Sequence, residues 1–200
     1  MKKLYLFIAI IFAISMTANA QYGKRPGSGS DTKFGVKAGA NLANMVGDDI
    51  KDSDILFGFH VGGYAQFGLS NAFALQGELL FDTKGAKDKD TNISLNLSYI
   101  SIPILAKVMF GEGFNVHAGP QIGILVSSKS DGEDLSKFYK STDIGGAVGL
   151  GYELESGLNF NARYSMSLTT IGEKIELPLV GDFEADIKNS VISISVGYSF

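Results

Sequence analysis

The feature that most constrains this chain is an alternation of apolar and polar residues with a period of two. It recurs in segments from residue 33 to the C-terminus and is clearest in the last one, where Ile192, Ile194 and Val196 alternate with Ser193 and Ser195. Successive side chains of a β-strand point to opposite faces, so the pattern predicts strands with one apolar and one polar face. No apolar run after residue 32 is long enough for a transmembrane helix.

Eight segments carry this alternation and predict an all-β chain. The predicted strands are 33–42, 56–69, 73–83, 95–110, 114–127, 142–154, 158–167 and 189–200. Their connections alternate in length. Three are tight (70–72, 111–113 and 155–157), and four are long and polar (43–55, 84–94, 128–141 and 168–188). In consecutive antiparallel strands, this alternation gathers all short turns at one end and all long loops at the other.

Short turns at one end and long loops at the other are typical of outer-membrane barrels, whose periplasmic turns are short and extracellular loops long. We therefore predict one domain over 33–200, an eight-stranded antiparallel up-and-down transmembrane β-barrel with its apolar faces toward lipid. The alternative is a soluble sandwich or lipocalin-like barrel with its apolar face inward. Two features favour the membrane barrel: the small residues on the polar faces, which suit a narrow interior, and the placement of the aromatic residues.

The first segment predicts export. Lys2 and Lys3 precede an apolar stretch over 4–14, and Ala18-Asn19-Ala20 matches a signal-peptidase site, so 1–20 is a predicted signal peptide cleaved after Ala20. The Gly/Ser-rich segment 21–32 is a predicted flexible lead-in.

Composition excludes several classes of function. The chain has no Cys, which removes disulfides, thiolate metal sites and a Cys nucleophile, and its two His leave little material for a metal centre. The net charge of −4 argues against nucleic acid as a partner. We expect no cofactor and no metal.

Aromatic residues mark the short-turn end of the apolar faces, which predicts a girdle at the periplasmic membrane interface. Its members, besides Phe34, are Phe67, Phe73, Phe110, Phe114, Tyr152, Phe160, Tyr198 and Phe200.

The polar faces place several ionisable side chains in the interior of the predicted barrel. The expected charge network comprises Lys37, Glu78, Lys107, Glu153 and Arg163, with Asp82 and Asp143 also facing inward. An unpaired buried charge is costly, so the first interpretation is a structural plug of paired charges. The alternative is a small-solute pore in which Glu78, Lys107 and Arg163 set the ion selectivity.

An enzyme can also be considered, because lipid-modifying barrels need catalytic groups near one rim. His60, Asp82, Asp143 and Ser165 are predicted to face the lumen near the long-loop end and could supply a triad. No nucleophile motif accompanies them, so we predict a non-enzymatic protein with no catalytic residues.

Four segments resemble the PorT-like outer-membrane β-barrel family. They are 34–42 (FGVKAGANL), 74–81 (ALQGELLF) with Lys84-Gly85, 99–107 (YISIPILAK) and 143–154 (DIGGAVGLGYEL). Together the resemblance spans essentially all of 33–200. It departs at Ser101, where the family often has Glu.

The resemblance implies an eight-stranded barrel in the outer membrane, in contact with lipid and lipopolysaccharide. The terminal Phe200 resembles the aromatic signal read by the barrel-assembly machinery. One member of the family assists secretion, so extracellular or secretion-system proteins are further expected partners. The expected role is structural or interactive, accessory to secretion or envelope integrity.

Overall fold

The structure, a computed structural model, describes residues 32–48, 50, 53–88, 93–130, 133–177 and 181–200. The predicted signal peptide, and all of the predicted lead-in but Thr32, lie outside these residues. Long strands dominate the described chain: β1 (Thr32–Val46), β3 (Leu56–Gly68), β4 (Phe73–Asp88), β5 (Ser94–Phe110), β6 (Phe114–Ser130), β8 (Thr142–Glu153), β9 (Leu158–Ser167) and β12 (Lys188–Ser199).

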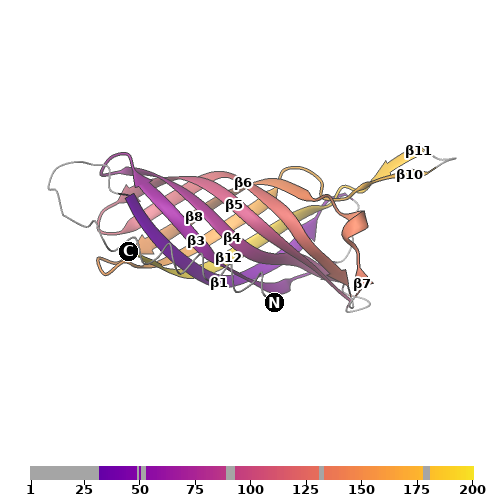
Figure 1. Cartoon of the computed structure of the whole chain (residues 1–200), viewed down its shortest axis with the longest axis horizontal. Coiled ribbons are helices and arrows are strands. Elements are labelled where there is room, and N and C mark those ends of the chain that lie inside the picture. The colour runs from indigo at the N-terminus through magenta and orange to yellow at the C-terminus, as the bar shows by residue number, and fades with distance from the viewer. Residues whose placement is uncertain (1–31, 49, 51–52, 89–92, 131–132, 178–180) are drawn as a thin grey trace, which may run out of the picture.

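These eight strands close into a barrel, because each has a hydrogen-bonded neighbour on both sides (Figure 1). Around the ring the order is β4, β3, β1, β12, β9, β8, β6 and β5, and β5 pairs with β4 to complete it. The first and last strands pair antiparallel from Gly35 opposite Ser199 to Val46 opposite Lys188. A closed ring leaves no strand edge unpaired, which is the condition for crossing hydrocarbon. The predicted fold class is confirmed.

Apolar side chains cover the outside of the ring and polar ones fill its inside. Phe57 and Ile194 are 79% and 61% exposed, whereas Lys37 and Glu78 are 4% and 3% exposed. On β5 the outward apolar residues run from Ile100 to Phe110. At ~3.3 Å per residue and a tilt of about 40°, they span ~25 Å along the barrel axis, the height of an outer-membrane apolar band.

The strands run further than predicted at the long-loop end. β1 reaches Val46 rather than residue 42, and β4 reaches Asp88 rather than residue 83. There Lys87 pairs with Ser94, so backbone hydrogen bonding continues after the apolar alternation has stopped. Apolar and polar residues alternate where one face of a strand contacts lipid. Backbone pairing between strands does not need lipid, so it continues beyond the alternating segment.

The predicted long connections also contain short elements. They are β2 (Ser53–Asp54), β7 (Glu133–Asp134), the 3-10 helix η2 (Ser136–Phe138), β10 (Lys174–Leu177) and β11 (Gly181–Glu184). β10 and β11 pair into a hairpin that projects beyond the barrel, at the end opposite the C-terminus (Figure 1). Among the described residues, no helix is long and apolar enough to cross a membrane.

Close packing inside the narrow barrel gives glycine a defined role at position 149. A Cβ at Gly149 would lie 2.5 Å from both the His117 ring nitrogen Nε2 and the Ala162 carbonyl oxygen. We expect Gly149→Ala to lower the free energy of unfolding by about 1–3 kcal/mol, measured by urea unfolding of the folded barrel. The matched control is Gly77→Ala, whose Cβ has no atom within 4 Å. An equal loss in both variants would contradict this packing.

Candidate functional site: the barrel lumen

The centre of the lumen contains a buried ion-pair cluster, named here the inner charge cluster: Lys37, Glu78 and Arg163. Arg163 donates from Nη1 to Glu78 Oε2 at 2.8 Å and from Nη2 to Glu78 Oε1 at 2.7 Å. Lys37 Nζ lies 3.4 Å from Glu78 Oε1. β4 and β9, which carry Glu78 and Arg163, occupy opposite positions in the ring. This bidentate pair therefore crosses the full width of the lumen.

The other two predicted members of the charge network do not pair with this cluster directly. Lys107 donates to Gln66 at 2.7 Å and to Gln76 at 3.0 Å, and Gln76 in turn donates to Glu78 at 2.6 Å. Glu153 accepts a hydrogen bond from Lys33 at 2.8 Å. The structure thus brings three of the five residues together, links Lys107 through an amide and places Glu153 in a separate pair.

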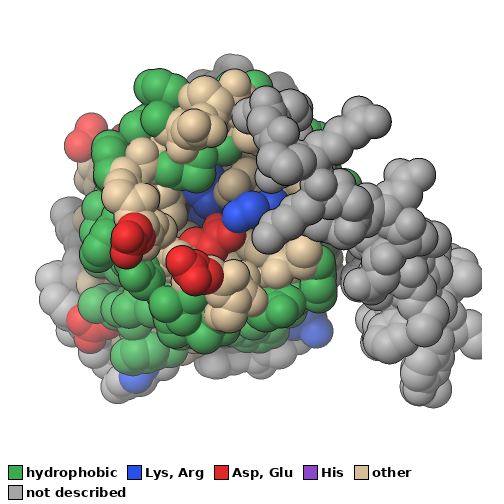
Figure 2. Space-filling model, turned by 90° about the vertical axis from the view of Figure 1, so that its left-hand side faces the viewer, with side chains coloured by type: hydrophobic (Ala, Val, Ile, Leu, Met, Phe, Trp, Pro, Cys, Tyr) green, Lys and Arg blue, Asp and Glu red, His purple; other side chains and the backbone are tan. Residues whose placement is uncertain are grey.

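The Lys33–Glu153 pair belongs to the short-turn end of the barrel. Lys33, near the start of β1, has a side chain that is 39% exposed. Seen from this end, charged side chains gather in the middle and hydrophobic side chains surround them at the rim (Figure 2).

A second cluster, the outer charge cluster, lies nearer the long loops and consists of Asp82, Lys84 and Asp143. Lys84 Nζ lies 3.7 Å from Asp82 Oδ2 and 3.4 Å from Asp143 Oδ2, and 4.6 Å from the centre of the Tyr99 ring. Ser101 donates to Asp82 at 3.1 Å. Lys84 is absent from the predicted network because the predicted strand ended at residue 83. Its even position, continuing the inward face of Glu78 and Asp82, was the signal that could have found it.

Three of the four candidate catalytic residues line one small cavity, and the fourth, Asp143, lines a second one. His60, Asp82 and Ser165 border a space of about 20 Å³, which accommodates water-sized particles but no acyl chain. The His60 Nδ1 atom is 2.8 Å from Asn41 Oδ1, and that oxygen also accepts a hydrogen bond from Ser193. An amide oxygen only accepts, so Nδ1 carries the proton and His60 is anchored to Asn41.

A cluster of buried apolar residues, named here the apolar plug, lies at the long-loop end of the lumen. Its buried members are Met45, Ala86, Leu97, Tyr99 and Ile171. Ile171 comes from the connection between β9 and β12 and is fully buried. Partly buried apolar residues, including Leu125 and Tyr139, pack around the plug. Burial raises the pKa of the Tyr139 hydroxyl.

Hydrogen bonds hold the segment that carries Ile171. Thr170 Oγ1 donates to the Ala185 carbonyl at 2.6 Å and accepts from the Ile187 amide at 3.0 Å. The Ile171 amide donates to the Ile187 carbonyl at 2.8 Å, and the Ile171 carbonyl accepts from the Lys140 amide at 2.8 Å. The plug residue is therefore fixed by backbone bonds on both sides.

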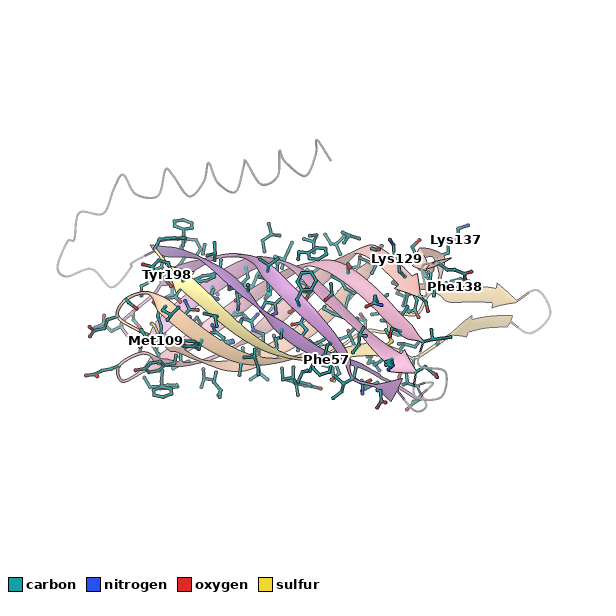
Figure 3. The ribbon with its side chains drawn as sticks, turned by 90° about the horizontal axis from the view of Figure 1, so that it is seen from below. Phe57, Met109, Lys129, Lys137, Phe138 and Tyr198 are labelled. Atoms are coloured by element: carbon teal, nitrogen blue, oxygen red, sulfur yellow. The ribbon has the colours of Figure 1, made fainter. Side chains whose placement is uncertain are left out.

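The residues of the predicted aromatic girdle lie on the outside, near the short turns. Phe67, Phe73 and Phe200 are exposed, and Tyr152 packs edge-on against Phe114 with ring centres 4.7 Å apart. Figure 3 places Tyr198 near this end of the barrel and Lys129, Lys137 and Phe138 near the other. A membrane-interface role for the aromatic residues stays a prediction.

A closed strand ring with an apolar outer face and a charged, packed interior defines a transmembrane β-barrel of the outer-membrane type. The model of a family described as outer membrane protein beta-barrel domain matches residues 19–172, which is more than half of the chain. The chain belongs to this family and is a protein of the bacterial outer membrane.

Several solved barrels resemble this one, among them Neisserial surface protein A and Ail. Neisserial surface protein A is 16% identical over 85% of this chain and 99% of its own, with a TM-score of 0.57. Ail, the attachment invasion locus protein of Yersinia pestis, solved with the heparin analogue sucrose octasulfate, is 16% identical over the same shares, with a TM-score of 0.52. At this identity the likeness shows the fold alone. Comparison with curated protein sequences gives no match.

Proposed function

We propose that this protein is a non-enzymatic structural and interaction barrel with a closed lumen, accessory to secretion or to envelope integrity. The observation that carries this proposal is the Arg163–Glu78 pair, which spans the lumen between opposite strands at 2.7–2.8 Å. The apolar plug adds a second barrier above it. A barrel obstructed twice along its axis is suited to presenting its loops rather than to passing solutes.

The proposed partners follow from the outer surface. Lys129 and Lys137 are exposed near the long-loop end beside Phe138, which is 54% exposed (Figure 3). Cationic side chains attract anionic head groups and aromatic rings anchor at the interface, so we propose contact with lipopolysaccharide there. The resemblance to PorT-like barrels supports a secretion-system or extracellular protein as the partner of the loops.

The two ends of the sequence carry the proposed signals for export and assembly. We propose that the signal peptide is cleaved after Ala20 and that Phe200 is read by the barrel-assembly machinery. Phe200 joins the closing seam, since its amide donates to the Phe34 carbonyl at 2.8 Å.

Single-channel recording of the barrel in planar lipid bilayers tests the closed lumen. We expect no reproducible conductance steps from the unaltered protein, because both obstructions fill the narrow interior. The matched control is the double variant Arg163→Ala and Ile171→Ala, which truncates one buried side chain of each obstruction and should give small steps. Reproducible steps from the unaltered protein would contradict the proposal and favour the pore alternative.

A further inference from the structure

The outer charge cluster is not electrically balanced. It contains two carboxylates, Asp82 and Asp143, and one ammonium group, Lys84. All three side chains are buried. The inner charge cluster has the opposite excess, with Lys37 and Arg163 facing the single carboxylate of Glu78. The two excesses cancel over the six residues, but no cation beyond Lys84 pairs with the two outer carboxylates among the described residues. A buried charge without a direct partner is destabilising, so the outer cluster by itself favours one additional positive charge.

Two buried acceptor atoms beside this cluster have no hydrogen-bond partner among the described residues: Asp143 Oδ1 and Asn189 Oδ1. Asp143 is 4% exposed and Asn189 is 2% exposed. The Asn189 amide nitrogen donates to Asp143 Oδ2 at 3.0 Å. That carboxylate can only accept, so it fixes the amide orientation and leaves Asn189 Oδ1 available as an acceptor.

Both residues line a small cavity of about 10 Å³. The other oxygen-bearing side chains around it are Gln121, Ser165 and Ser167, and the ammonium-bearing side chain of Lys84 also lines it. This volume holds one particle the size of a water molecule. Carboxylate, amide and hydroxyl oxygens are the ligands that hard cations prefer.

We propose that the cavity beside Asp143 and Asn189 binds a single monovalent metal cation of the size of Na⁺. A cation satisfies both acceptors and also supplies the missing positive charge, whereas a water molecule does only the first. A divalent ion is disfavoured, because no group of three His, Cys, Asp or Glu side chains surrounds any point in the described part of the chain. The bound ion would complete the neutralisation of the outer charge cluster within the closed lumen.

The test compares NaCl with choline chloride at equal concentration, because choline is too large for the cavity. The full-length chain is refolded from urea into detergent micelles in each salt, and its thermal unfolding midpoint is measured by the change in gel mobility on heating. We expect a higher midpoint in NaCl, rising with the logarithm of the Na⁺ concentration. Asp143→Asn should abolish the difference between the salts. The control Asp54→Asn, at an exposed carboxylate on β2, should keep it.

Two outcomes would overturn the proposal. Equal unfolding midpoints of the unaltered protein in NaCl and choline chloride would mean that the cavity holds a water molecule. This comparison tests the proposal even if Asp143→Asn does not fold. A Na⁺ effect that persists in folded Asp143→Asn would place the ion elsewhere.

Discussion

Glu78→Gln is expected to lower the free energy of unfolding by about 3–5 kcal/mol. The substitution preserves the volume of the side chain but removes its charge, which leaves Arg163 and Lys37 buried without a counter-ion. In the native barrel, Glu78 accepts both guanidinium bonds of Arg163 and is 3% exposed. Urea unfolding of the barrel in lipid vesicles, followed by circular dichroism, measures the loss.

Glu153→Gln is the matched control, since it removes the same charge from another ion pair of the same barrel. Its partner Lys33 has a side chain that is 39% exposed, so water screens the interaction. Exposed pairs contribute about 0–1 kcal/mol, and we expect a loss in that range. If the two variants lost equal stability, the inner charge cluster would not be the interaction that ties the strands together across the lumen.

Ile171→Ala is expected to release the apolar plug while leaving the barrel folded. Truncating a buried isoleucine lowers stability by about 2–5 kcal/mol. Here we expect the loss to lower the free energy of opening the connection between β9 and β12, rather than that of unfolding the strand ring. Even the lower figure raises the population of the opened connection about 30-fold. We expect the Ile171 amide, which donates to the Ile187 carbonyl, to exchange with deuterium faster by at least that factor, as measured by mass spectrometry of intact barrels in vesicles.

Leu168→Ala provides the control in the same connection, because Leu168 is 66% exposed and lies outside the plug. In this variant the exchange rate of the Ile171 amide should stay within a few-fold of that in the unaltered protein. Equal acceleration in both variants would mean that the connection is held by its hydrogen bonds alone. Loss of the folded band on gels of Ile171→Ala would show instead that the plug supports the whole barrel.

The sequence predicted the faces of the strands well, because side-chain direction in a strand depends only on odd or even position. Lys37, Glu78 and Arg163 were assigned to the interior on this basis, and all three are buried. The same reasoning assigned Lys107 and Glu153 inward but could not show that Lys107 bonds to glutamines or that Glu153 pairs with Lys33. Pairing depends on the height of each residue along the barrel axis, which alternation does not determine.

The long-loop end was predicted least well. The apolar alternation stops before Lys84 and predicts a loop there, although the strand continues to Asp88. The alternation does not predict the apolar plug either, because Ile171 lies in a polar connection. Nothing in the residues around Ile171 indicates that this segment folds back to the mouth of the barrel. Contact with Leu97 and Tyr99, more than 70 residues earlier, is what buries it.

The sequence by itself therefore determined the strands, their number, their two faces and the class of protein, because period-two alternation and connection length are local properties. The tertiary structure alone decided which charges meet. Glu78 and Arg163 are 85 residues apart and become partners only because ring closure puts β4 opposite β9 at a matching height. The register of each strand pair between β4 and β9 sets the relative height of Glu78 and Arg163 along the barrel axis. It therefore decides whether the two side chains can pair across the lumen.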